Sequence, residues 1–343
     1  MRKENNTQGR RGFIKGAAAV SAVGTVGLAG CLGDDGEETI QVNSPAGEES
    51  IQGLIPTWFS EYVDEINEGL EVEVFYGGEL GGHAESVDNV VTGGLDMYVS
   101  GIEIFSGHYE MLDLFAAPYL YEDFDHLLEA TDPDQSDAAD EIFTQYREET
   151  GVRIIGPAIQ GTRRVTTSDT EVYEPSDLEG LTLRSPGPTI YVETVSGLGA
   201  SVTEVDQPEI PTALAQGTVD GQENPYSIIY GDGIYEHQQY IIETDHMITP
   251  MAIHMNEDVF QGLSDTHQDV LLEAEDMMVE HAVSWLEDEI DDIKDTMREE
   301  GLEIIEHDEI DAEAFQESVL DNIYDAYDDE FLELAADISP NYE

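Results

Sequence analysis

The chain has 343 residues, enough for one large or two medium domains with a substantial core. Its 77 Asp and Glu outnumber 12 Lys and Arg, and the formal net charge of −65 at pH 7 makes nucleic acid an unfavourable partner. Hydrophobic residues make up 40% of the chain and recur periodically, which excludes an acidic disordered polymer.

The acidic residues are spread along the chain, which disfavours an acidic interaction tail. After Cys31 the chain carries seven basic and 76 acidic residues, and Lys294 is the single lysine of that stretch. At molar salt the Debye length falls to roughly 3 Å, so the repulsion between these carboxylates is largely screened. The composition therefore predicts the surface of an extreme halophile, of the haloarchaeal type.

The first 31 residues are typical of an export signal. The run from Arg10 to Lys15 resembles the twin-arginine motif, an apolar run follows, and the segment ending at Cys31 resembles a lipobox. This order predicts export by the twin-arginine route and a lipid on Cys31 that anchors the protein on the outer face of the cytoplasmic membrane, with residues 32–38 as a tether. An uncleaved anchor helix is the alternative. With Cys31 the single cysteine, no intramolecular disulfide is possible.

In the first half of the chain, short segments in which polar and apolar residues alternate are followed by amphipathic segments with helical spacing. This βαβαβ rhythm predicts a parallel sheet covered on both faces. Strands are expected at residues 39–45, 71–78, 95–101 and 152–168, and helices at 50–68, 81–94 and 137–150.

In the second half, a turn, a strand and a loop are expected over 177–188, a helix over 190–197, and a helix followed by a loop over 208–225. Residues 240–256 predict one or two strands that carry the chain back. A long amphipathic helix is expected over 264–300, capped by Ser264 or Asp265 and ended by Gly301. A last helix is expected over about 312–336.

Catalytic motifs are missing from the sequence. There is no Gly-x-Ser-x-Gly elbow and no phosphate-binding glycine loop, and none of the nine histidines forms a His-Glu-x-x-His pair. With 77 acids, any carboxylate pair is uninformative about glycoside hydrolysis. The sequence thus predicts neither an enzyme nor a metal or cofactor site.

Three of the seven basic residues after Cys31 lie within residues 161–188: Arg163, Arg164 and Arg184. A guanidinium meets a carboxylate with two parallel hydrogen bonds, and a buried one is screened little by salt. Arg184 lies at a strand end, where a side chain reaches a cleft. Arg163 and Arg164 point to opposite faces of a strand, so at most one of them faces that cleft. The alternative is that all three form surface salt bridges.

An ordered set of segments resembles the solute-binding proteins of tripartite ATP-independent (TRAP) transporters. The segments are "VFYGGELGGHAESVDNVVTGGLDM", "AAPYLY", "GTRRVTTS", "DLEGLTLRSP" and "VDGQENP". The resemblance covers nearly all of the chain after the signal. It implies that Arg184 clamps the ligand carboxylate, that Asn224 hydrogen-bonds the same carboxylate, and that Arg163, or else Arg164, is a second arginine on the ligand side.

The remaining candidate pocket positions match the family pattern less closely. Gln160 is expected to line the pocket, and Gln207 replaces an aromatic residue of many relatives, which implies a more polar ligand or another wall. Ser100 and Gly101 lie where some relatives place an acidic residue that reads an amine or hydroxyl. The missing acid argues against an amino-sugar acid. Pro45 likewise replaces a polar residue of the first loop.

The family fold implies an α/β protein of two lobes, like the periplasmic binding proteins, with a ligand cleft between the lobes and a long helix across both. Lobe I is expected to hold residues 39–160 and about 249–290, and lobe II residues 161–248 and about 291–343.

The leading hypothesis is a receptor that binds an organic acid and hands it to TRAP permease subunits in the membrane. The alternatives are a sensory binding protein and a secreted enzyme. The sequence leaves open which carboxylate is bound, the oligomeric state, and whether a cation takes part in binding.

Overall fold

A computed structural model describes residues 38–66 and 69–342. Its sheet has nine strands in the order β2-β1-β3-β8-β4-β7-β5-β6, with β9 beside β8. The strands are β1 Glu38–Asn43, β2 Leu70–Phe75, β3 Met97–Gly101, β4 Val152–Thr167, β5 Thr182–Ser185, β6 Ser201–Glu204, β7 Gly221–Pro225, β8 Tyr240–Asn256 and β9 Glu303–Ile305. The export signal and lipidation predicted at Cys31 lie outside the described residues.

The first three strands form the predicted parallel unit. β1 lies between β2 and β3 and is parallel to both. The helices α1 (Ile51–Ile66) and α2 (His83–Thr92) are the crossover connections. The sheet as a whole is mixed, because β3 pairs antiparallel with β8. The expectation of a parallel sheet for the first half of the chain therefore holds for β1–β3, whereas the complete sheet is mixed.

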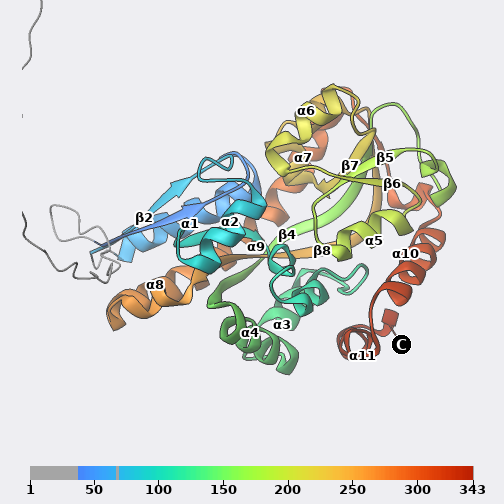
Figure 1. Cartoon of the computed structure of the whole chain (residues 1–343). Helices are drawn as coiled ribbons and strands as arrows, with labels where there is room; N and C mark the ends of the chain where they lie inside the picture. The colour runs from blue at the N-terminus through green and yellow to red at the C-terminus, as the bar shows by residue number, and fades with distance from the viewer. Residues whose placement is uncertain (1–37, 67–68, 343) are drawn as a thin grey trace, which may run out of the picture.

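Two long antiparallel strands, β4 and β8, connect the two parts of the molecule (Figure 1). Beyond them, β7 is antiparallel to β4, and β5 is parallel to both β7 and β6. Residues 221–225 were expected to be a loop, but the main-chain pairing with β4 makes them the strand β7. Residues 240–256 form one continuous strand.

The ladder between β4 and β8 is interrupted near its middle. Register shifts occur between Ile155 and Ala158, between Ile159 and Gly161, and between Arg163 and Val165. Gly161 has a φ of 128°, which favours glycine, and a Cβ there would lie 3.0 Å from the Pro225 side chain. Bulges of this kind bend a strand and increase its local twist.

The long helix α9 (Asp265–Glu299) begins at the predicted cap, because Ser264 Oγ accepts a hydrogen bond from the His267 N–H (3.1 Å). Its apolar stripe packs against α1, β4 and α7 (Tyr226–Gly231), so it contacts elements of both parts of the molecule. The helix ends just before Gly301, whose φ of 101° lies in the left-handed region that favours glycine.

Further helices cover the two faces of the sheet. They are α3 Phe124–Thr131, α4 Asp137–Thr150, α5 Thr189–Gly197, α6 Ile210–Ala215 and α8 Glu257–Gly262. The segment expected as one last helix is two, α10 (Ala312–Ala326) and α11 (Asp329–Ile338). The two helices are separate because Asp328 caps the second one. Its carboxylate accepts a hydrogen bond from the Phe331 N–H at the start of α11.

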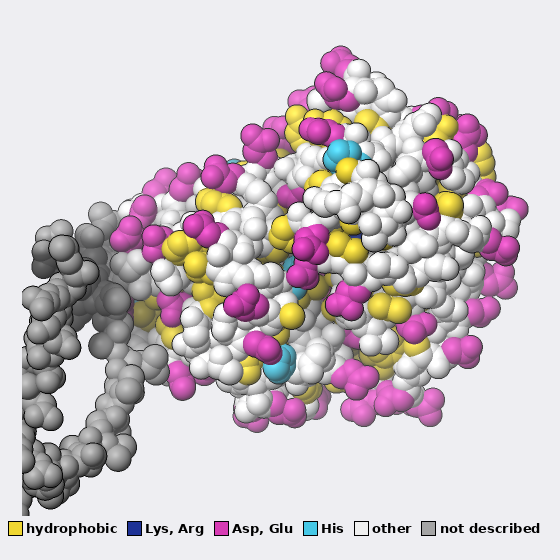
Figure 2. All heavy atoms as spheres, turned by 45° about the horizontal axis from the view of Figure 1, so that its top comes forward, with side chains coloured by type: hydrophobic (Ala, Val, Ile, Leu, Met, Phe, Trp, Pro, Cys, Tyr) yellow, Lys and Arg dark blue, Asp and Glu magenta, His cyan; other side chains and the backbone are white. Residues whose placement is uncertain are grey.

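Acidic side chains are scattered over the face seen in Figure 2, with scarcely a basic one among them. Within residues 38–66 and 69–342, every helix is too short or too polar to span a bilayer.

Candidate functional site

Arg163 and Arg164 lie on opposite faces of β4, as the alternation of a strand requires. The Arg163 side chain is buried. Arg164 points to the other face, where it pairs with Asp245 (3.1 Å) and lies over the Tyr226 ring at 4.5 Å. The ambiguity left by the sequence is thereby removed, because Arg163 faces the interior cavity described below and Arg164 does not.

Each side-chain nitrogen of Arg163 donates to a protein partner. Its Nε and Nη2 donate to the two carboxylate oxygens of Glu223, which the antiparallel β7 places beside it. Its Nη1 donates to Gln160 Oε1 (2.9 Å), and its Nη2 also donates to Asn224 Oδ1 (3.0 Å). Burial alone would raise the pKa of Glu223, but Arg163 and a hydrogen bond with His246 lower it to about 2. The buried pair is therefore ionised and neutral overall.

Arg184 has no such partner. It lies on β5, is 2% exposed, and its Nε donates to the main-chain oxygen of Val205 (2.7 Å). Its buried Nη2 meets no acceptor among the described residues. Burial lowers its pKa to about 10, and the neighbouring Arg163 charge adds to the lowering. The site thus holds a buried cation with an open hydrogen-bond donor, an arrangement that an anion would stabilise.

Two buried side chains with open acceptors face the same cavity from the other part of the molecule. Glu103 follows β3 in the 3₁₀ turn Ile102–Phe105, and its Oε2 has no donor among the described residues. Its Oε1 accepts the Tyr191 hydroxyl (2.8 Å), and burial raises its pKa to about 7. Gln52, in the first turn of α1, has an Oε1 without a donor.

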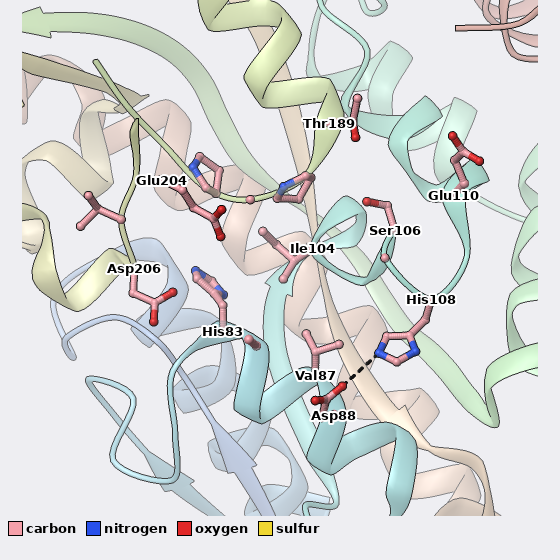
Figure 3. A pocket seen from close by; sticks show the side chains of 16 residues that line it. His83, Val87, Asp88, Ile104, Ser106, His108, Glu110, Thr189, Glu204 and Asp206 are labelled. Carbon is pink, nitrogen blue, oxygen red and sulfur yellow. Dashed lines mark hydrogen bonds and ion pairs between the residues drawn. The ribbon is translucent and has the colours of Figure 1, made fainter. Parts of the chain in front are cut away.

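The cavity between these groups is small, with a volume of about 10 Å³. It is lined by Gln52, His83, Gly101, Glu103, Ile104, Gln160, Arg163, Arg184, Pro186, Tyr191, Gln207 and Asn224. A larger hollow of about 650 Å³ shares His83, Ile104 and Pro186 with it. In Figure 3, Glu204 and Asp206 face His83 across this hollow, and His108 contacts Asp88 (3.3 Å). An acidic hollow therefore adjoins a cavity that holds a free arginine.

The structure brings together five of the predicted site residues: Arg163, Arg184, Asn224, Gln160 and Gln207. Gln207 donates to Asp232 (2.7 Å), so the cavity wall at this position is polar. Ser100 does not line the cavity, because its hydroxyl donates to the main-chain oxygen of Gly101 (3.0 Å). Of the described residues, no group of His, Asp and Glu could hold a metal ion.

Two polar side chains that the sequence analysis did not single out, Glu103 and Gln52, also line the cavity. The strand end has no acid at Ser100 or Gly101, but Glu103 supplies one from the next turn, and Gly101 leaves room for its carboxylate because a Cβ there would collide with it. Likewise Gln52, which follows Pro45 closely in the sequence, contributes a polar side chain to the cavity lining. The signal for both was a lone polar residue within an apolar segment, in "GIEIF" and in the first turn of the helix.

Replacing Arg163 by Met is expected to lower the free energy of unfolding by about 3–5 kcal/mol, because Glu223 would remain buried without its cation. Guanidinium chloride titration measures the loss. The double variant Arg163→Met, Glu223→Gln is expected to lose about 0.5–3 kcal/mol less than the sum of the single variants. Additive losses would contradict this direct pairing.

Comparison with known proteins places the chain in one family, whose fold it shares. Residues 42–330 match the family model described as bacterial extracellular solute-binding protein, family 7. A solute-binding protein of Roseobacter denitrificans is 30% identical over 253 residues, covering 74% of this chain and 76% of that one. The 2,3-diketo-L-gulonate-binding periplasmic protein of Escherichia coli is 28% identical over 253 residues, covering 74% and 73%.

Solved structures agree with this match. A TRAP periplasmic solute-binding protein from Roseobacter denitrificans, crystallised with bound L-galactonate, superposes with a TM-score of 0.81. It is 26% identical, and the match covers 88% of this chain and 98% of that one.

Proposed function

Because the chain belongs to family 7 of the bacterial extracellular solute-binding proteins, we propose that it is the receptor of a TRAP transporter, which binds an organic acid through Arg184 and delivers it to permease subunits in the membrane. Its relatives are solute-binding proteins, so the chain is not an enzyme. The fold is that of the TRAP periplasmic binding proteins.

The observation that carries the proposal is the open donor of Arg184. A planar guanidinium offers a donor fork that matches a carboxylate, and a buried one stabilises an anion more than an exposed one does. Asn224 lines the same cavity and is the second group that we assign to the ligand carboxylate. Arg163 is assigned a different role from the one the resemblance implies. Saturated by Glu223, it holds the wall in place and orients Asn224.

Binding is proposed to close the two lobes on the ligand, with lobe I at residues 39–160 and about 249–290, and lobe II at 161–248 and about 291–343. The cavity wall supports this division, because Gln52 and Glu103 belong to the first and Arg184 and Asn224 to the second. A ligand that contacts both sets favours the closed arrangement.

Two of the relatives support an organic acid as the solute. One is named for binding 2,3-diketo-L-gulonate, and another holds L-galactonate in its crystal structure. Export by the twin-arginine route, a lipid on Cys31 and a halophilic origin remain proposals from the sequence. A sensory role that presents the same ligand to a signalling receptor is the alternative to transport.

Thermal unfolding in molar KCl tests the proposal with a panel of organic acids that includes L-galactonate, and with galactitol as the control that lacks the carboxylate. An acid at 100 times its dissociation constant is expected to stabilise the protein by about 2.7 kcal/mol, whereas galactitol is expected to have no effect. Stabilisation by galactitol equal to that by an acid would overturn the carboxylate assignment. No stabilisation by any acid would count against the proposed function itself.

A further inference from the structure

We propose that Asp113 and Tyr327 form a latch that closes together with the two lobes, and that the Asp113 carboxylate takes up a proton from solvent as the latch closes. The inference rests on the proposed function, in which binding of an organic acid closes the lobes. It adds a proton as a second ligand of the receptor, bound at a residue outside the cavity lining.

Asp113 connects two parts of the molecule. It lies in the 3₁₀ helix Glu110–Ala116, which follows β3 in the chain and packs against α5, α11 and β8. Its Oδ2 accepts the hydroxyl of Tyr327 (2.6 Å) at the corner between α10 and α11. Tyr327 is held there by stacking on Phe331, with 4.0 Å between the ring centres. In the proposed division, Asp113 belongs to lobe I and Tyr327 to lobe II, so closure of the lobes would form this hydrogen bond.

The latch is coupled to the ligand cavity through its neighbours. The 3₁₀ helix Ile102–Phe105, which packs against the helix of Asp113, contributes to the cavity lining, and α5 contributes Tyr191. The helix α10, which ends at Tyr327, packs alongside α5 (Figure 1). A ligand that draws these walls together would therefore also draw Asp113 toward Tyr327.

The closed latch leaves Asp113 in surroundings that disfavour a charge. The side chain is 2% exposed, and its Oδ1 is buried without a hydrogen-bond donor among the described residues. Neither of the two 3₁₀ helices, nor α5, α10 or α11, contains a lysine, an arginine or a histidine. A buried carboxylate without a cation is costly, and protonation removes that cost.

The acids around the latch reinforce this preference. Glu110 on the same 3₁₀ helix and Glu103 on the one before it place like charges near Asp113. Glu193 on α5 is a further acid, and it acts on Tyr327. Burial raises the pKa of Asp113 to about 6, although the hydroxyl of Tyr327 opposes the rise.

The strand β8 also packs against the helix of the latch, but its titratable side chains are engaged elsewhere. His246 contacts Glu223 (3.2 Å), and burial lowers the pKa of His254 to about 3, so that this ring carries no charge. The acids Glu243 and Asp245 belong to other ion pairs. Neither histidine is therefore available to neutralise the carboxylate of the latch.

Closure and proton uptake are expected to favour each other. In the open receptor the latch carboxylate would face solvent, where an aspartate has a pKa of about 3.9. In the closed receptor burial raises that pKa to about 6. The closed state therefore binds more protons than the open state at a pH near these two values, and binding of the organic acid should become tighter as the pH falls. At pH 8 both states are ionised, so burial of the charge opposes closure.

Calorimetric titration with L-galactonate in molar KCl measures this linkage. The carboxylate of L-galactonate stays ionised at pH 5, so the ligand itself does not titrate. The wild type is expected to bind about tenfold or more tighter at pH 5 than at pH 8. At pH 6 the binding heats in MES and in bis-tris, two buffers without a carboxylate, are expected to show an uptake of about half a proton or more.

The variants assign the proton to a residue. Asp113→Asn keeps the shape of the side chain without its charge, so it should bind about tenfold or more tighter than the wild type at pH 8 and take up less proton at pH 6. Tyr327→Phe removes the donor of the latch and is expected to weaken binding about three- to tenfold at pH 8, and less at pH 5. Asp321→Asn, an exposed acid on α10, is the matched control and should behave as the wild type.

A wild-type affinity that is equal at pH 5 and pH 8 would overturn this inference and leave the proposed function intact. Weaker binding by Asp113→Asn at pH 8, as expected from the loss of a merely structural contact, or undiminished proton uptake in that variant would do the same. So would wild-type affinity of Tyr327→Phe at pH 8. Failure of L-galactonate and of every other acid of the panel to bind would overturn the proposed function, and this inference with it.

Discussion

Arg184→Ala is expected to weaken binding of the organic acid by about 2–5 kcal/mol, which is about 30-fold or more. The carboxylate would enter a buried cavity without the guanidinium that neutralises it, since the Arg163 donors are committed to Glu223, Gln160 and Asn224. The ligand-free variant should be no less stable than the wild type, because the substitution removes a buried cation whose Nη2 lacks an acceptor. Affinity and stability are thus expected to change in opposite directions.

Calorimetric titration and thermal unfolding measure the two effects on the same preparation. Arg164→Ala is the matched control, since that arginine pairs with Asp245 on the opposite face of β4. It should lose stability and keep its affinity. Arg184→Lys should also bind weakly, because an ammonium cannot form the two parallel hydrogen bonds of a guanidinium. Binding by Arg184→Ala within about threefold of wild type would refute the assignment of Arg184.

Transfer from molar to 0.1 M KCl is expected to unfold the protein. After Cys31 the chain has seven basic and 76 acidic residues, and the face seen in Figure 2 carries many acids and scarcely a basic side chain. The Debye length grows from about 3 Å at 1 M to about 10 Å at 0.1 M, so carboxylates that were screened begin to repel one another. A folded state of ordinary stability, about 5–15 kcal/mol, is lost when many such pairs each contribute a fraction of a kcal/mol.

Circular dichroism across a KCl series measures this transition. Sucrose is the control, because it is excluded from protein surfaces but screens no charge. Restoration of the fold by NaCl as well as KCl, and not by sucrose, would identify screening as the cause. A melting temperature that is equal in dilute and molar KCl would contradict a halophilic surface.

Periodicity predicted most of the elements because the pattern of a helix or strand is local. The long helix with its Ser264 cap and the parallel unit of β1–β3 were confirmed. The strand β7 was missed because "GQENP" is polar and contains a proline, and its main-chain partners lie about 60 residues earlier in β4. The break between α10 and α11 was missed because the apolar stripe continues across it.

The cavity was predictable in part. The family resemblance identified Arg184 and Asn224 as candidate ligand-binding residues. The alternation of side chains along a strand predicted that Arg163 and Arg164 point to opposite faces, but it did not show which of them faces inward. Glu103 could not be recognised, because one acid among 77 carries no mark of burial until the fold places it against Tyr191. The pairing of Arg163 with Glu223 could not be predicted either, because it depends on the register between β4 and β7, which the sequence does not contain.

The three register shifts between residues 155 and 165 have a mechanical meaning. An uninterrupted antiparallel ladder resists bending, whereas a ladder that loses its regular rungs over ten residues yields at that place first. If the proposed closure of the lobes bends the ladder at this place, the parts on either side would move as two rigid bodies. Under the proposed function, a membrane protein that touches both parts would then distinguish the occupied from the empty receptor without contacting the solute.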